Sequence, residues 1–368
     1  MADLKFQYEG LKRFCIDIFE KFGFDRKNSE IITDVLLLSD LYGIDSHGTQ
    51  RLLRYYKHLQ AGLIDANAKA ETVFETPISA VIDANLGMGQ IVSYNAMNLA
   101  IEKAQTNGIG MVTVKNSNHY GIAGYYAKMA CDKGLIGISV TNTEAIMVPT
   151  YSRKAMLGSN PIAVAMPADP YPFFFDASTS VVTRGKLELY KKLDKEMPDC
   201  WGLDDQGKVN TSAPHVLDCI AAHKGGGIMP LGGAYEKTGG HKGYGYGMLC
   251  EIFSSILSLG VTSDKTYADG KARICHGFIA INPNLFGDPA AIKEHLSEFL
   301  QTLRDAPKAE GCDRIYTHGE KEIIALNDRL NNGIAITMNT VKEMKACGEG
   351  FGMNFADYFG EELASQVK

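Results

Sequence analysis

The chain has 368 residues, 45% of them hydrophobic and 22% charged, with a formal net charge of -6, a composition typical of a globular protein. It has no run of lysines and arginines and no stretch of 18 apolar residues, which argues against nucleic acid, an anionic membrane surface or a membrane span as its setting. The N-terminus has no apolar segment behind a basic start, so it does not resemble a signal peptide. The eight cysteines are scattered, and we expect reduced thiols in a soluble cytoplasmic protein without a metal site.

The predicted elements change in character along the chain. Apolar residues recur at helical spacing from about 5 to 60, which predicts a helical region. From residue 78 onward, strands and helices alternate, as in an α/β fold. The expected strands span 78–82, 110–115, 135–141, 163–166, 173–176, 274–281 and 333–338. The expected helices span 89–105, 123–133, 244–260, 285–304, 320–330 and 340–347.

The common nucleotide-binding and hydrolytic motifs are absent from the sequence. Gly87 and Gly89 follow a predicted strand, but Val92 stands where the dinucleotide fingerprint needs its third glycine. Walker A, His-Glu-x-x-His and Gly-x-Ser-x-Gly sequences do not occur either. The sequence therefore contains no motif that would indicate a standard Rossmann fold, phosphoryl transfer, zinc proteolysis or serine hydrolysis.

A first polar segment surrounds His47. His47, Arg51 and Tyr55 are spaced four residues apart, so they would share one face of a helix. An imidazole can move a proton, and a guanidinium can hold a carboxylate by two parallel hydrogen bonds. These are the two groups that a 2-oxo acid requires. The alternative is an amphipathic helix with a simple cap and solvated charges.

A second polar segment, 116–121, follows the strand predicted at 110–115 and contains His119. Ligands of α/β folds bind beyond the carboxyl ends of strands, so His119 is a candidate to orient a ligand or to move a proton. The alternative is a polar turn whose side chains bond to its own backbone.

Four further polar segments lie in apolar surroundings, at 158–161, 176–180, 239–247 and 318–320. The turn after Asp176 offers backbone N–H groups and hydroxyls to a phosphate or a ribose. The glycines of 239–247 permit close backbone approach to a ligand, and Lys242 can pair with a phosphate. Helix caps and a flexible loop are the alternatives.

Taken in order, these segments resemble one family. The matching sequences are Ser46-His47-Gly48-x-x-Arg51, Asn116-Ser117-x-His119-x-Gly121, Gly158-Ser159-Asn160-Pro161, Phe175-Asp176-x-Ser178-Thr179-Ser180, Gly185-Lys186, Lys242-Gly243-x-Gly245 and His318-Gly319-Glu320. The chain resembles the malate/L-lactate dehydrogenases of the second type, also called the sulfolactate-dehydrogenase-like oxidoreductases. Each motif alone is weak, but their number and order make the resemblance specific.

The resemblance implies a fold and a mode of assembly. It implies a mixed-sheet α/β domain at 73–305 that binds NAD(H) or NADP(H) without the ordinary Rossmann fingerprint; we expect NAD(H). It also implies a mostly helical domain built from both chain ends, 1–72 with 306–368. Members of the family are usually homodimers with the active site in a cleft near the subunit contact.

The resemblance also implies roles for single residues. His47 and His119 are expected beside the reacting carbon, one of them as proton donor and acceptor, and Arg51 and Tyr55 are expected to hold the substrate carboxylate. The residues expected to bind the cofactor are Thr143, Gly158, Asn160, Asp176, Ala177, Ser178, Thr179, Lys186, Lys242, Gly243, His318, Gly319 and Glu320.

The expected reaction interconverts a small 2-hydroxy acid and its 2-oxo acid, with malate and oxaloacetate favoured. Lactate, sulfolactate and ureidoglycolate dehydrogenation and cyclic-imine reduction are alternatives on the same scaffold. A cofactor-free lyase or hydrolase using the two histidines is an alternative of another class. A second substrate carboxylate would need a second cation, for which Arg54, Lys115 and Lys186 are candidates.

Overall fold

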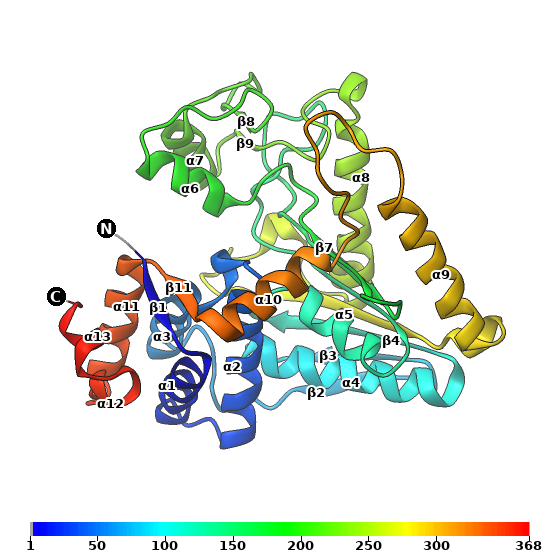
Figure 1. The fold of residues 1–368 in the computed structure, drawn as a ribbon. Coiled ribbons are helices and arrows are strands. Elements are labelled where there is room, and N and C mark those ends of the chain that lie inside the picture. The colour runs from blue at the N-terminus through cyan, green and yellow to red at the C-terminus, as the bar shows by residue number, and fades with distance from the viewer. Residues whose placement is uncertain (1–2, 368) are drawn as a thin grey trace.

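The computed structural model describes residues 3–367, and its centre is a seven-stranded mixed sheet (Figure 1). The strand order is β2 (Glu71–Glu75), β3 (Ser79–Asp83), β4 (Ile109–Ser117), β10 (Ile274–Ile281), β5 (Ile136–Thr141), β6 (Ile162–Met166) and β7 (Phe173–Ala177). Only β3 and β4 are parallel neighbours; the other neighbouring pairs are antiparallel. The predicted mixed α/β fold is confirmed.

This topology brings several chain segments to one edge of the sheet. Because β10 runs antiparallel to both β4 and β5, those two strands end at the same edge, at Ser117 and Thr141. β6 begins at that edge and β7 ends there. The predicted segments 116–121, 158–161 and 176–180 therefore lie together although they are far apart in sequence.

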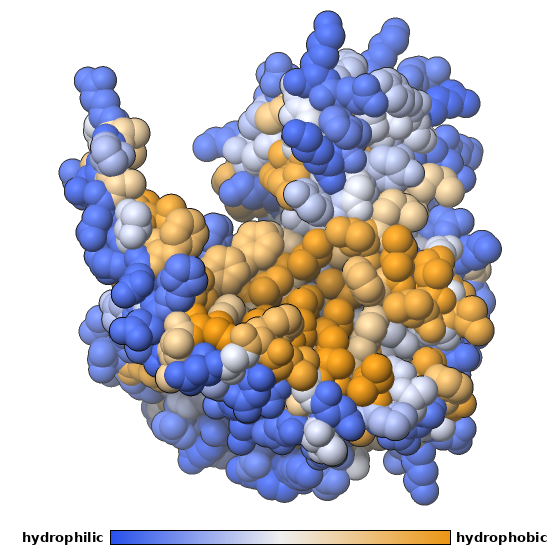
Figure 2. Space-filling view, turned by 90° about the vertical axis from the view of Figure 1, so that its right-hand side faces the viewer, coloured by the Kyte–Doolittle hydropathy of each residue, from blue (hydrophilic) through white to orange (hydrophobic). Residues whose placement is uncertain are grey.

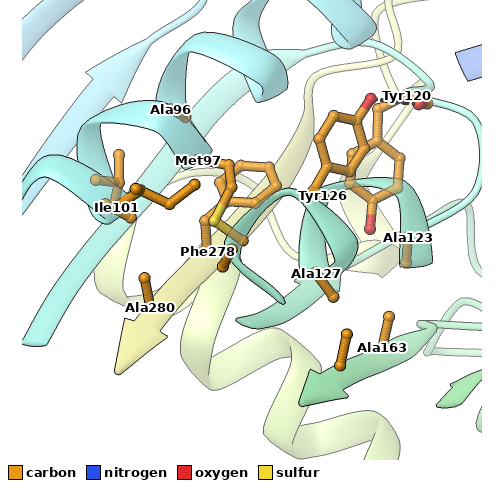
Figure 3. Close-up of a cluster of buried hydrophobic side chains, with 14 of the residues drawn as sticks. Ala96, Met97, Ile101, Tyr120, Ala123, Tyr126, Ala127, Ala163, Phe278 and Ala280 are labelled. Carbon is orange, nitrogen blue, oxygen red and sulfur yellow. Dashed lines mark hydrogen bonds between the residues drawn. The ribbon is translucent and has the colours of Figure 1, made fainter. Parts of the chain in front are cut away.

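Helices cover both faces of the sheet. On one face α4 (Gly89–Asn107) and α5 (Gly124–Cys131) pack over the central strands, and Figure 3 shows Met97, Tyr126 and Phe278 filling the space between them. On the other face lie α8 (Gly240–Glu251) and the π-helical turn η4 (Ile252–Ile256), whose backbone meets Gly277 of β10. The sheet is thus buried on both faces at its centre. This packing holds rigidly the edge at which β4, β5 and β7 end.

The two chain ends pack together in a helical region, coloured blue and red in Figure 1. It contains a small sheet of β1 (Leu4–Phe6) and β11 (Ile334–Ile336), and its helices are α1 (Tyr8–Lys21), α2 (Arg26–Leu41), α3 (Leu52–Gln60), α11 (Met338–Glu349), α12 (Ala356–Phe359) and α13 (Glu361–Ser365). Phe14, Leu36 and Val341 belong to one buried cluster of this region. α9 (Pro289–Arg304) and α10 (Glu320–Asn332) connect β10 of the central sheet to β11 of this helical region. The division of the chain into two domains at residues 72 and 305 stays a prediction.

A small lobe between β7 and α8 was not predicted. It contains α6 (Arg184–Lys192), α7 (Ala213–Ala222), β8 (Gly202–Leu203) and β9 (Gly227–Ile228), which share a small apolar cluster around Leu187 and Val216. Strand β2 was missed as well, because every one of its residues is exposed and no apolar alternation marks it.

Three predicted helical boundaries are wrong. Between α2 and α3 the chain forms two short 3-10 turns, η1 (Asp45–His47) and η2 (Thr49–Arg51), separated by Gly48 in an extended conformation. His47 and Tyr55 therefore do not share a helix. α8 begins at Gly240, so the glycine-rich segment forms its first turns and is not a loop before it. α9 begins at Pro289, where the side chain of Asp288 caps it.

No helix within residues 3–367 combines the length and hydropathy that a membrane crossing needs. All eight cysteines are free.

Candidate active site

A cavity of about 490 Å³ lies at the edge of the sheet where β4 and β5 end. His47 and Arg51 reach it from the turns before α3, His119 from the end of β4, and Thr143 from the end of β5. The candidate proton-transfer residues and the candidate carboxylate anchor thus line one cavity, together with a residue expected near the nicotinamide.

Two imidazoles lie side by side in this cavity. The rings of His47 and His119 are stacked with their centroids 5.5 Å apart. Nδ1 of His119 lies 2.6 Å from the hydroxyl of Tyr55, and Nδ1 of His47 lies 2.8 Å from the hydroxyl of Ser46. Among the described residues neither Nε2 atom has a hydrogen-bond partner, so each remains available to a substrate.

Both histidines are held in the neutral form. Burial, together with Arg51 and Arg54, lowers the pKa of His47 to about 3. Burial, Arg54 and His47 also lower the pKa of His119 well below its usual value. A neutral imidazole can accept a proton from an alcohol, and an anion placed on the arginines would make its protonated form more stable.

The turn that carries His47 is held by a buried carboxylate. The backbone N–H of Thr49 donates to Asp40 at 2.8 Å, and a Cβ atom at Gly48 would overlap that carboxylate. Burial raises the pKa of Asp40 to about 7, against the lowering effect of the bonds from Thr49. Arg329 of α10 bonds to the backbone carbonyl of Asp40 and to the side chain of Asp45. Asp40 and Arg329 therefore fix the position of His47.

The arginines of the cavity have different partners. Nε of Arg51 donates to the carbonyl of Ser46 at 2.6 Å, and Nη2 of Arg54 lies 2.9 Å from the hydroxyl of Tyr267. Arg184 of α6 forms ion pairs with Glu144 at 3.4 Å and Glu188 at 3.3 Å. Arg51 and Arg54 therefore remain the cations of the cavity that lack a carboxylate partner among the described residues.

Tyr55 lies behind the cavity wall. It is fully buried and contacts His119 and does not line the cavity itself. Its expected role in holding the substrate carboxylate stays a prediction, and its position favours orientation of His119 instead.

Several functional candidates escaped the sequence analysis. His276 of β10 lines the cavity, but both its nitrogens are occupied, by Thr141 at 2.8 Å and by the carbonyl of Asn118 at 3.2 Å. His58 and Tyr267 also line it. No local motif marks these residues, although His276 falls near the start of the strand predicted at 274–281.

Glu251 forms the centre of a buried polar network below the cavity. Its carboxylate accepts hydrogen bonds from the side chains of Asn142 (3.3 Å), Asn160 (3.1 Å) and Ser255 (2.6 Å), and from Ser263. Oδ1 of Asn160 accepts in turn from the backbone N–H of Thr143 at 3.0 Å. This network fixes the residue expected beside the nicotinamide. Glu251 is the last residue of α8, and no motif around it in the sequence indicated the network.

Comparisons with known proteins agree with this geometry. The profile of the family described as malate/L-lactate dehydrogenase matches residues 6–345. The chain belongs to the malate/L-lactate dehydrogenase family. It is 40% identical to a malate dehydrogenase of Pyrococcus abyssi, over 92% of this chain and 93% of that one. It is 37% identical to an L-sulfolactate dehydrogenase of Methanocaldococcus jannaschii, over 95% and 98% of the two chains.

A solved structure shows the same fold. A malate dehydrogenase from Entamoeba histolytica superposes with a TM-score of 0.92 at 34% identity, covering 96% of this chain and 99% of that one. As a member of the malate/L-lactate dehydrogenase family, this chain is a hydroxyacid dehydrogenase that acts on a small molecule with a nicotinamide cofactor. The alternative of a cofactor-free lyase or hydrolase is set aside.

Some of the residues expected to bind the cofactor are linked in a path of contacts that begins at the cavity. Gly158 lies against the hydroxyl of Thr143, and the hydroxyl of Thr179 donates to the carbonyl of Asn160 at 3.1 Å. The carbonyl of Thr179 accepts from the backbone of Leu231, which packs against Gly243 in the first turn of α8. Small side chains, hydroxyls and the start of a helix are suited to a dinucleotide. Of these residues Thr143 lines the cavity, and the expected part of the others in binding the cofactor stays a prediction.

Asp176 and Ser178 occupy the end of β7 beside this path. Asp176 is directed at α5, where it accepts from the backbone N–H of Gly124 at 2.7 Å. Burial raises the pKa of Asp176 to about 6 in spite of that bond. Ala177 ends the strand, and Ser178 bonds to the carbonyl of Ser180 at 3.0 Å. Asp176 thus starts helix α5 as well as bordering the expected cofactor site.

The turn 318–320 lies against the other side of β7. The carbonyl of His318 accepts from the backbone of Phe174 at 3.1 Å, and the left-handed conformation of Gly319 (φ +104°) lets the turn approach that strand. Burial acts to raise the pKa of Glu320, but hydrogen bonds from Arg304, Thr317 and Arg314 lower it to about 2. The Glu320 carboxylate is thus engaged within the protein.

Lys186 and Lys242 are the least constrained of the expected cofactor residues. Both are exposed, Lys186 on α6 and Lys242 in the first turn of α8. Neither lines the cavity, so the structure does not bring them together with the histidines.

Proposed function

We propose that this dehydrogenase interconverts malate and oxaloacetate, with NAD(H) as its cofactor. The observation that carries the proposal is the cavity itself, in which two neutral histidines and a guanidinium face the residue at the expected nicotinamide position. The similarity to proteins named malate dehydrogenase supports this substrate. L-Sulfolactate is the second candidate, because a similar relative carries that name.

The proposed mechanism assigns separate tasks to the side chains of the cavity. When bound, the nicotinamide supplies or accepts the hydride at C2 of the substrate. Arg51 holds the C1 carboxylate by two parallel hydrogen bonds and so orients C2. Nε2 of His119 removes the hydroxyl proton during oxidation and returns it to the carbonyl oxygen during reduction.

His119 is favoured over His47 because of the groups around it. The Tyr55 hydroxyl fixes Nδ1 of His119 at 2.6 Å from a buried position, so the ring has one orientation and Nε2 is its reactive nitrogen. Nδ1 of His47 bonds to Ser46, a part-buried neighbour in a short turn. His47 remains the alternative proton carrier, and in this mechanism it helps to position the substrate oxygen.

NAD(H) is preferred over NADP(H) because of the charges near the turn 318–320. The guanidinium groups of Arg304 and Arg314 both bind the carboxylate of Glu320. They are therefore not free to hold the additional phosphate of NADP(H). Comparing the KM values for NADH and NADPH tests this preference.

We also propose that the chain forms a homodimer through the face of α8 and η4. Figure 2, which views the right-hand side of Figure 1, shows a broad hydrophobic area. Tyr246, Leu249, Ile252, Ile256 and Leu257 are exposed along α8 and its continuation. An apolar patch of this kind marks a subunit contact. Light scattering on the wild type and on Ile252→Glu tests it: a dimer that the substitution dissociates supports the proposal.

A cytoplasmic location is proposed as well. The eight free thiols support it, because such cysteines persist in a reducing compartment. Cell fractionation with an antibody against the chain tests it.

The deciding experiment for the function follows the loss of NADH absorbance with oxaloacetate, pyruvate and sulfopyruvate. Turnover that is fastest with oxaloacetate supports the malate proposal. Turnover that is fastest with another oxo acid keeps the dehydrogenase and replaces the substrate. Failure with all 2-oxo acids, together with the absence of cofactor binding by fluorescence, overturns the proposal.

A further inference from the structure

The charges of the cavity are unequally balanced. Of the charged residues that line it, Arg184 forms ion pairs with both Glu144 and Glu188, so this cluster keeps one negative charge. Their side chains keep between 34% and 49% of their surface exposed, which places this cluster at the rim. Arg51 and Arg54 lie further along the wall and have no carboxylate within ion-pair distance in the described part of the chain. The arginines and glutamates that line the cavity sum to a charge of +1, and the two guanidinium groups without a carboxylate partner, Arg51 and Arg54, face the space that the substrate enters.

Arg54 is oriented by a neutral group. Its Nη2 bonds to the hydroxyl of Tyr267 at 2.9 Å, and Tyr267 also lines the cavity from the loop before β10. A phenol fixes the direction of the guanidinium without cancelling its charge, and it leaves the other N–H groups free for an anion. Arg54 lies three residues after Arg51, so both side chains leave the same short stretch of chain toward one cavity.

We propose that Arg54, oriented by Tyr267, binds the second anionic group of the substrate and makes the cavity selective for 2-oxo acids that carry two negative charges. This inference rests on the proposed function, in which Arg51 holds the C1 carboxylate. An acid with one carboxylate leaves Arg54 without an anionic partner in the substrate complex, which is unfavourable for a partly desolvated cation. A carboxylate or a sulfonate at the far end of the substrate provides that partner.

The other candidate cations do not meet these conditions. Lys186 is exposed on α6, and Lys115 of β4 does not line the cavity. His58 lines it, but burial and Arg54 lower its pKa, so it does not act as a cation there. Arg54 is thus the second anion anchor that the geometry supports.

The test compares oxaloacetate with 2-oxobutyrate, which has a similar length but only one carboxylate. Arg54→Gln is expected to lower the ratio of kcat/KM for oxaloacetate to kcat/KM for 2-oxobutyrate by about 100-fold. Lys57→Gln removes the same charge from an exposed position of the same helix and is the matched control. Tyr267→Phe is expected to lower kcat/KM for oxaloacetate to a smaller extent. Thermal unfolding and NADH binding confirm that each variant is folded.

The outcomes separate this inference from the function on which it rests. A wild type that reduces no 2-oxo acid overturns the proposed function. A wild type that reduces oxaloacetate and 2-oxobutyrate equally well, or an Arg54→Gln variant that loses both activities in the same proportion, overturns the role of Arg54 and leaves the dehydrogenase in place. A preference for oxaloacetate that Arg54→Gln abolishes and Lys57→Gln retains supports the inference.

Discussion

The hydroxyl of Tyr55 lies 2.6 Å from Nδ1 of His119, although 64 residues separate the two in the chain. Tyr55 belongs to α3 in the helical region, whereas His119 follows β4 at the edge of the central sheet. This hydrogen bond joins the two halves of the active site, as does the bond between Arg54 and Tyr267, and the orientation of the proposed proton carrier depends on how the helical region packs against the sheet.

Tyr55→Phe is predicted to lower kcat by about 10-fold with little change in KM for the oxo acid, because the net value of one hydrogen bond is about 1–1.5 kcal/mol. The ring packing is retained and only the bond to Nδ1 is lost. Steady-state kinetics with oxaloacetate provide the measurement, with Tyr56→Phe as control. An increase in KM at unchanged kcat would assign Tyr55 to the substrate carboxylate instead.

His119→Gln is predicted to reduce the rate of hydride transfer by about 100-fold or more, the usual contribution of a positioned acid–base group. His47→Gln is predicted to have a smaller effect on the rate and a larger one on KM. Single-turnover absorbance changes after mixing with oxaloacetate measure both, while fluorescence titration checks that NADH still binds. The reverse order of the two effects would make His47 the proton carrier.

The pH dependence of malate oxidation is predicted to respond to Arg54. Burial and the positive charge of Arg54 hold the pKa of His119 below its usual value, so the base stays unprotonated and active as the pH falls. Removing that charge in Arg54→Gln raises this pKa, so protonation begins at a higher pH. The acid limb of kcat/KM therefore moves to higher pH.

The matched control for this shift is Lys57→Gln, which should leave the acid limb where it is in the wild type. An acid limb that stays in place in Arg54→Gln, or moves to lower pH, contradicts the electrostatic role assigned to Arg54.

Glu251→Gln is predicted to destabilise the fold by about 2 kcal/mol, because the new amide NH₂ group faces donors and leaves buried polar atoms unsatisfied. Glu251 accepts from Asn142, Asn160 and Ser255, and Asn160 holds the backbone of Thr143. We therefore expect a lower urea midpoint and a raised KM for NADH. An unchanged midpoint would show that the network is dispensable.

Local signals in the sequence predicted most strands of the central sheet and several of the residues that line the cavity. The strand at 110–115 is a short apolar run, so its end, and with it the position of His119, could be inferred. His47, Arg51 and His119 do meet in one cavity, but not for the expected reason, because Gly48 interrupts the helix that was to align them.

Contacts across long sequence separations could not be predicted. The bond between Arg54 and Tyr267 spans 213 residues, and the Glu251 network joins four segments that carry no common motif. Such pairings are set by the packing of the whole chain. The exposed strand β2 has no apolar alternation by which it could be recognised locally. Helix α7 does carry a local signal, because its buried residues Ala213, Val216, Leu217 and Ile220 recur at helical spacing after a Ser212 cap.

The place of β10 between β4 and β5 has a consequence for how the enzyme is made. A chain leaving the ribosome presents β2–β3–β4 and β5–β6–β7 long before residues 274–281 emerge. Until that strand arrives, β4 and β5 are both open edges, which invite pairing with other chains. Insertion of β10 closes both edges and joins the walls of the cavity in one event. A newly made chain thus lacks the joined cavity walls, and exposes the edges of β4 and β5, until this late strand has emerged.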